Sequence, residues 1–413
     1  MIDLLGNTVT VSSARALRSY ERAVDAQLHA WPGAAQAVDE ALAEAPEFAL
    51  AHALRALLAL TYSRIDEARD ACASAVAGAA GTSAREQSHV ALVAAIVGGR
   101  PTEALARVQQ HARSFPTDVL SAATAVGAYG LFAFSGRHDH DAARRDFVES
   151  LAPHLPAELP WLVVHRAWVR IECGDTAEGL EMAQRAMALR PQNGHGAHVL
   201  LHGLYEAQQP QQALDFLQAW LPGYADDALM WGHLQWHGAL SELALGDDAA
   251  ATRRLLGPVM SYLPKGAPYM GLPDTASLLW RLGLRGARAL PAQPALAHAQ
   301  RHFSNGSNVF GELHLALLAA ASRDDAALAA GLQRLEQSAA RGQDGAPVVA
   351  TFIHALIATR QGDADAAQRH WHQCLQELPR IGGSHAQRAV VELTHQAGRL
   401  PLERLAGQLA AVP

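Results

Sequence analysis

Two pairs of histidines are the residues of this sequence whose spacing most clearly allows chemistry. They are His198 with His202 and His233 with His237. Residues four apart on an α-helix project from the same face. The separations 233 − 198 and 237 − 202 both equal 35 residues, close to a helical hairpin repeat of roughly 34 residues. The spacing therefore predicts that the two pairs lie on neighbouring helices and face one site.

Four imidazoles facing one groove allow three kinds of chemistry. A pair at i and i+4 supplies two nitrogens to one ion, so the set could bind a divalent transition metal as a cofactor. The set could also hold an anionic ligand or supply a general base, and for that catalytic role we select His202 and His237. The zincin motif is absent, because Val199 and Leu234 stand where it requires glutamate. The alternative interpretation is that all four histidines are hydrogen-bonded core groups.

Residues further along the chain could complete such a site. Trp236 and Trp280 could shape a pocket, since indole combines apolar area with a donor. Arg281 suits a carboxylate or phosphate ligand, or else a buried salt bridge. Asp274 follows a proline at a position typical of a helix N-cap, and Glu206 lies one turn past His202. The ligand-binding candidates are His198, His233, Trp236, Asp274, Trp280, Arg281, Glu312 and His314.

The composition predicts an all-α protein. Half of the 413 residues are hydrophobic, 6% are aromatic, and alternating runs of β-branched residues are lacking. The formal charge is −7 and Lys265 is the only lysine, so nucleic acid is excluded as an expected partner. The N-terminal residues show no signal-peptide pattern and no apolar run is long enough for a bilayer. We therefore expect a cytoplasmic protein without a membrane partner.

Three cysteines, Cys72, Cys173 and Cys374, lie far apart and form no CxxC motif. Such an odd and scattered set indicates neither a disulfide framework nor a thiolate metal cluster. We expect them to fill small apolar spaces in the core.

Helical periodicity recurs in hairpin-sized segments along the chain. Ser12 or Ser13 can cap a first helix, and Ser83 with Glu86 forms a capping box. Gly-Asp turns at 174–175 and 362–363 are each followed by small residues and a later proline, as in the second half of a tetratricopeptide repeat. The pattern predicts one α-solenoid domain over residues 1–413, built of tetratricopeptide-type helical hairpins curled around a central groove.

Two segments depart from this regularity. Residues 257–273 are rich in glycine and proline, and they predict an irregular segment that either covers the concave face or forms a long connection. The pair His298 and His302 precedes a polar loop, so we expect it at the surface.

Several short strings, in order, give the chain a resemblance to one family. They are Arg85-Glu86-Gln87 with His89-Val90, Phe115-Pro116-Thr117-Asp118, His198 with His202 and Glu206, His233 with Trp236-His237, the segment 274–282, and Phe310 with Glu312 and His314. Over nearly its whole length the chain resembles the family of tetratricopeptide repeat protein 38. That family usually has aspartate where this chain has Glu312. The resemblance implies a helical-repeat fold and no established reaction.

Two functions follow from these observations. The first is the binding of a small molecule or short peptide in a histidine-lined concave pocket, in one form as a metal-dependent enzyme. The second is a protein–protein interaction scaffold without catalytic activity, as in most such solenoids. A scaffold of this kind favours exposed lysine, arginine and asparagine clamps, and the near absence of lysine favours the first function.

Overall fold

The computed structural model describes residues 1–287, 290–398 and 400, and in these residues the chain is all-α. The described residues form no strand, and a single isolated β-bridge joins Ile2 and Thr8. Contacts divide the chain into two compact units. The first unit comprises residues 1–132, 141–203 and 228–230, and the second comprises 133–140, 204–227 and the chain from 231 on.

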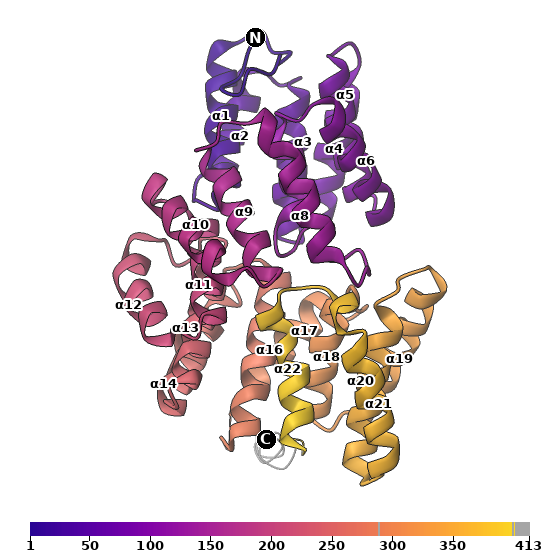
Figure 1. Cartoon of the computed structure of the whole chain (residues 1–413). Coiled ribbons are helices and arrows are strands. Elements are labelled where there is room, and N and C mark those ends of the chain that lie inside the picture. Colours follow the sequence, from indigo (N-terminus) through magenta and orange to yellow (C-terminus); the bar gives the residue numbers. More distant parts are fainter. Residues whose placement is uncertain (288–289, 399, 401–413) are drawn as a thin grey trace. The chain divides into compact units, whose positions relative to one another are not determined.

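The first unit consists of helices that pair as antiparallel hairpins along the sequence (Figure 1). Its helices are α1 (Ala14–Leu28), α2 (Ala34–Glu44), α3 (Ala49–Thr61), α4 (Ile65–Ala79), α5 (Ala84–Val97), α6 (Pro101–Ser114), α7 (Val119–Val126), α8 (His140–Leu151), α9 (Pro160–Glu172), α10 (Thr176–Leu189) and most of α11 (Gly194–Glu206).

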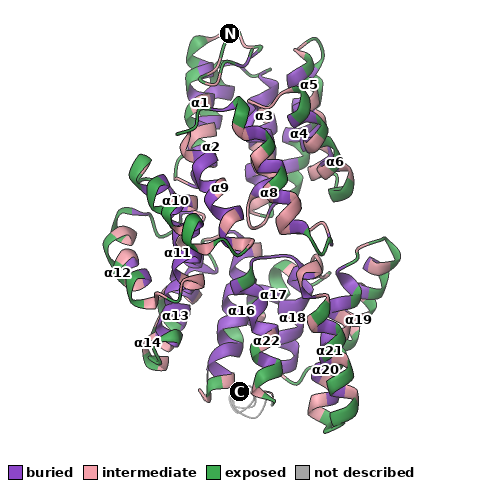
Figure 2. Ribbon diagram, viewed as in Figure 1, coloured by how far each residue is buried: buried purple, intermediate pink, exposed green. Residues whose placement is uncertain are grey.

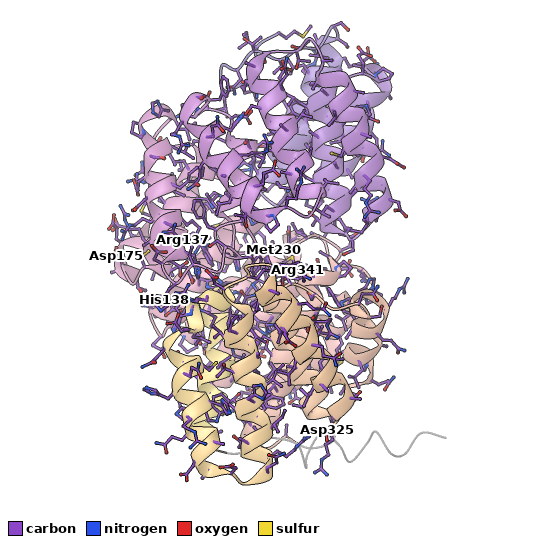
Figure 3. The ribbon with its side chains drawn as sticks, turned by 90° about the vertical axis from the view of Figure 1, so that its right-hand side faces the viewer. Arg137, His138, Asp175, Met230, Asp325 and Arg341 are labelled. Atoms are coloured by element: carbon purple, nitrogen blue, oxygen red, sulfur yellow. The ribbon has the colours of Figure 1, made fainter. Side chains whose placement is uncertain are left out.

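The second unit continues the alternation. Its helices are α12 (Pro210–Trp220), α13 (Trp231–Ala244), α14 (Asp248–Arg254), α15 (Met260–Tyr262), α16 (Pro268–Arg285), α17 (Gln293–Phe303), α18 (Val309–Ala321), α19 (Asp325–Ala340), α20 (Ala346–Gln361), α21 (Ala364–Gln376) and α22 (His385–Ala397). Asp325, labelled in Figure 3, begins α19 and pairs with Arg360 of α20 at the surface.

Local sequence signals account for the hairpins. At the start of α5 the Ser83 side chain accepts a hydrogen bond from the backbone amide of Glu86, and the Glu86 side chain accepts one from the backbone amide of Ser83. This pair confirms the predicted capping box. Gly174 adopts a φ of 93°, which lets the chain turn between α9 and α10. A Cβ on Gly179 of α10 would lie 2.9 Å from the backbone nitrogen of Ile171 in α9. Small residues therefore set how closely the helices cross, as predicted for a tetratricopeptide-like helical repeat.

Alanines and one cysteine fill the interface of α3, α4 and α5. Ala53 and Ala56 of α3 pack with Cys72 and Ala75 of α4 and with Val93 of α5. Cys72 therefore fills apolar space as expected, and the buried thiol of Cys374 does the same in the second unit.

The predicted irregular segment 257–273 is largely helical. A π-helical turn spans Leu255–Val259, α15 follows it, and α16 begins at Pro268. Proline at the first helical position costs no hydrogen bond, and Pro273 is retained inside α16 because nearly the whole helix is buried (Figure 2). The predicted N-cap role of Asp274 is therefore wrong, since this residue lies well inside α16.

Two further expectations concern the surface and the membrane. His298 is 6% exposed and its Nε2 donates to the carbonyl oxygen of Pro268 over 2.9 Å, so the predicted surface position is wrong for this histidine. His302 is exposed as expected. Within the described chain, no helix combines the length and the apolar character that crossing a bilayer requires. The single domain and the central groove involve both units together and stay predictions.

Candidate functional site

Helix α16 is the element that organises the polar core of the second unit. It packs against α13, α18 and α22, which lie around it in Figure 1. Asp274, Ser277 and Arg281 follow one another at three- and four-residue spacing, so they share one face of α16. This face meets the histidine-bearing helix α13 through the contacts below.

A buried imidazole–carboxylate pair joins α13 to α16. His233 Nδ1 lies 2.8 Å from Asp274 Oδ1, and the side chains are 1% and 3% exposed. Burial raises the pKa of Asp274, and the neighbouring His233 opposes that rise. Because an ionised carboxylate can only accept, Nδ1 donates and the lone pair of the imidazole resides on Nε2. The same tautomer is imposed on metal-binding and general-base histidines by their carboxylate partners.

Trp236 is fixed beside this pair. Its indole nitrogen donates to Ser277 Oγ over 3.0 Å, and its ring stacks on His233 with centroids 5.1 Å apart. The guanidinium of Arg281 lies 5.9 Å from the same ring. His237 completes the group, with its ring 4.9 Å from that of His233. The second unit thus brings together five of the residues selected from the sequence.

Arg281 is a buried cation to which the described residues offer no anion. The residue is 4% exposed, and its Nη2 donates a hydrogen bond to the carbonyl oxygen of Ala386 over 2.7 Å. Its Nε has no hydrogen-bond partner, and no carboxylate of the described residues pairs with it. Burial lowers the pKa of the guanidinium. Within the part of the chain that the structure describes, the salt bridge considered as an alternative from the sequence is therefore not formed.

His314 of α18 is neutral and has an unused nitrogen. Its Nδ1 donates to the carbonyl oxygen of Phe310 over 2.8 Å, which places the lone pair on Nε2. That Nε2 is buried and, among the described residues, lacks a hydrogen-bond partner. Burial, together with nearby Arg281, lowers the pKa of His314 to about 4, although its bond to Phe310 acts in the opposite direction.

Glu312 and Trp280 have structural partners instead. Glu312 accepts from Arg334 Nε at 2.8 Å and from Nη2 at 2.9 Å, and its Oε1 also accepts from the amide of Ser307. The indole nitrogen of Trp280 donates to Thr394 Oγ1 over 2.9 Å. These contacts tie α18 to α19 and α16 to α22, so we assign neither residue to the site.

The first unit holds a second imidazole–carboxylate arrangement. His198 Nε2 and His202 Nε2 face each other at 2.9 Å, and the Trp168 ring packs against both imidazoles. Glu172 Oε1 lies 3.3 Å from His202 Nδ1, and both side chains are fully buried. At 2.9 Å, either one nitrogen carries a proton that the other accepts, or both ligate one ion. The convergence of both histidine pairs on one groove stays a prediction from the sequence.

The sequence did not identify Glu172. The carboxylate selected instead was Glu206, whose Oε1 accepts from His385 Nδ1 over 2.9 Å in the second unit. Glu172 is the last residue of α9 and is 30 positions before His202 (202 − 172 = 30), which matches no helical or repeat spacing. No local signal could have found it.

A further buried cluster in the first unit surrounds Asp118. His89 Nδ1 lies 3.1 Å and His111 Nε2 lies 3.3 Å from Asp118 Oδ2, to which Arg85 Nη1 donates over 2.5 Å. Burial opposes ionisation of Asp118, but the histidines and Arg85 hold its pKa well below the usual range. A metal at these three ligands would compete with the guanidinium for the carboxylate. We therefore assign the cluster to stability.

Comparison with known proteins leaves the family open. No family model matches the chain. Among solved structures, the chain is similar to a Rap protein complexed with Competence and Sporulation Factor, with a TM-score of 0.39 and 10% identity over 82% of this chain and 99% of that one. It is also similar to the TPR domain of P58(IPK), with a TM-score of 0.21 and 14% identity over 96% of this chain and 90% of that one. The helical-repeat assignment rests on the hairpins themselves, and the resemblance to the tetratricopeptide repeat protein 38 family stays a prediction.

Proposed function

We propose that the second unit binds a small molecule at α13 and α16, with His233, Trp236 and Arg281 as its contacts. The observation that carries this proposal is the buried pair of His233 and Asp274, 2.8 Å apart. Nothing in the packing of two helices requires such a pair, because burying ionisable groups costs more than burying apolar ones of similar volume. A histidine that serves only the core can bond a backbone carbonyl, as His298 does.

The arrangement suits acid–base chemistry. A histidine whose Nδ1 donates to a buried carboxylate is the usual general base, because its other ring nitrogen carries the lone pair. The carboxylate then stabilises the imidazolium that forms. His237 and Trp236 flank the ring and fix its orientation. We therefore propose His233 as the general base, because its Nδ1 contacts the buried carboxylate of Asp274.

Metal-dependent chemistry is the second form of this proposal. An imidazole whose Nδ1 faces a buried carboxylate is the usual ligand arrangement for a transition metal, and each unit has one, at His202 with Glu172 and at His233 with Asp274. A divalent ion bound by such imidazoles would supply Lewis acidity. The metal ligands that we propose are His198 and His202 in the first unit and His233 and His237 in the second.

A binding screen tests the function directly. The untagged full-length chain is titrated with a library of metabolites, with thermal stabilisation as the readout, and its metal content is measured by elemental analysis. We expect at least one compound to bind with an affinity that His233→Ala and Asp274→Asn each lower by about tenfold or more, the effect of losing one charge-assisted hydrogen bond. His354→Ala, which removes an exposed histidine of α20, is the matched control and should leave binding unchanged.

The scaffold function predicts a different outcome. A stoichiometric protein partner would co-purify, and its binding would survive the His233 and Asp274 changes. The surface depression between α21 and α22 offers a place for a peptide, since Asp365, Arg369, His372 and His395 line it. If no library compound binds and such a partner is retained by both variants, the small-molecule proposal is wrong. A chain that neither contains metal nor takes up added zinc removes the metal form.

A further inference from the structure

The buried guanidinium of Arg281 needs an anion that the described residues do not provide. An arginine rarely lies in a protein interior without a paired carboxylate, because desolvation of its charge costs several kcal/mol. Arg281 offsets that cost with one backbone carbonyl, at Ala386, and with the face of the Trp236 ring. Both contacts stabilise a cation, but neither supplies a negative charge.

We propose that this part of the second unit binds a phosphate group, with Arg281 as its counter-charge and His314 Nε2 as the acceptor of the P–OH proton. This inference rests on the proposed function, because the phosphate would belong to the small molecule on which His233 acts. It goes further by naming the chemical group that the site recognises.

Arg281 alone would accept any planar or tetrahedral oxyanion. A guanidinium donates two parallel hydrogen bonds to a carboxylate, a sulfate or a phosphate with similar geometry. The choice among these anions must come from a second group close to it.

His314 provides that choice, because it is buried on α18, which packs against α16, the helix that carries Arg281. Its Nδ1 is already committed to the carbonyl of Phe310, so its Nε2 can only accept a hydrogen bond while the ring is neutral. A singly protonated phosphate carries both a charged oxygen for Arg281 and an O–H donor for this nitrogen. Sulfate and carboxylate carry no proton near neutral pH, and they would place an oxygen lone pair against the lone pair of Nε2. The buried nitrogen without a partner thus favours phosphate over other oxyanions.

The site also accounts for the position of Trp236. Its ring stacks on His233 on one side of the group and receives the guanidinium of Arg281 at 5.9 Å. The tryptophan therefore connects the anion-binding group to the acid–base group. A phosphorylated molecule held at Arg281 would have its remaining part directed towards His233.

Inorganic phosphate is the probe for this inference. The untagged full-length chain is titrated by calorimetry with sodium phosphate, sodium sulfate and sodium malonate at pH 7 and constant ionic strength. We expect saturable binding of phosphate, with sulfate and malonate at least about tenfold weaker, the equivalent of about 1.4 kcal/mol for the hydrogen bond to His314. Arg281→Met should abolish phosphate binding, Arg281→Lys should retain it at reduced affinity, and His314→Leu should remove the preference for phosphate over sulfate.

Arg285→Met is the matched control, because Arg285 is on the same helix and pairs with Asp248 at the surface. It should bind phosphate as the wild type does. Circular dichroism establishes that each variant is folded. The inference is overturned if the wild type shows no saturable binding of phosphate, or if folded Arg281→Met binds phosphate as tightly as the wild type. A response to phosphate that His233→Ala leaves unchanged supports this inference even if the acid–base role of His233 fails its own test.

Discussion

The variant Asp118→Asn is expected to lower the free energy of unfolding by about 3–5 kcal/mol, the cost of breaking a buried ion pair from one side. Asp118 is 6% exposed and accepts from Arg85, from His89 and from the backbone amide of Ser121 at the start of α7. Asparagine keeps the shape but removes the charge, so the guanidinium of Arg85 would remain buried without an anion. The loss of stability should be largest at neutral pH. The lowered pKa keeps the Asp118 carboxyl ionised until the pH falls well below the ordinary pKa of an aspartate.

Urea unfolding of the full-length chain measures this loss. The control is Asp325→Asn, which removes one partner of an exposed ion pair with Arg360 and should have little effect on stability. A loss for Asp118→Asn no greater than for the control would contradict the assignment of this cluster to stability. It would also reopen the cluster as a binding site.

Acidification is expected to destabilise the second unit through His314. Burial, with Arg281 nearby, lowers the pKa of this imidazole to about 4, whereas an unfolded histidine has a pKa of about 6.5. Between these two values the unfolded chain binds a proton that the folded chain does not, so stability falls as the pH drops below about 6.5. The contribution of His314 reaches about 3 kcal/mol at pH 4.

Unfolding by urea at pH 7, 5.5 and 4.5 tests this expectation. His314→Leu should reduce the difference in unfolding free energy between pH 7 and pH 4.5 by about 2–3 kcal/mol. His354→Ala, at an exposed position, should not change it. Burial also lowers the pKa of His165 in the first unit, so part of the acid sensitivity should remain in the His314 variant. An unchanged pH dependence in that variant would show that His314 is not buried in its neutral form.

The sequence correctly predicted those features of the fold that depend on residues close together in the chain. The capping box of Ser83 and Glu86 and the close helix crossing at Gly179 follow from residues a few positions apart, and both are observed. The same local reasoning failed at Asp274. The preceding proline indicated a helix start, but the burial of α16 outweighs the hydrogen bond that Pro273 cannot make.

The sequence predicted the members of the candidate site but not the contacts among them. Periodicity selected His233 and His237 because they lie on one helix, and side-chain chemistry together with a family resemblance added Trp236, Asp274 and Arg281. The sequence could not show that Asp274 bonds His233 rather than capping a helix, or that Arg281 forms no ion pair with the described residues. Both facts depend on how helices far apart in the sequence pack. Glu172, which no spacing connects to His202, could be found only in three dimensions.

The most direct test of this account is the unfolding free energy of Arg281→Met in buffer without phosphate, compared with that of Arg334→Met. Arg334 pairs through two nitrogens with buried Glu312, and its loss should cost about 3 kcal/mol, because a buried carboxylate would remain unpaired. If α16 presents Arg281 to a ligand, its replacement removes an uncompensated buried charge, and the stability should be unchanged or rise by about 1–2 kcal/mol. A loss for Arg281→Met as large as that for Arg334→Met would show that Arg281 serves the fold and would contradict the ligand site.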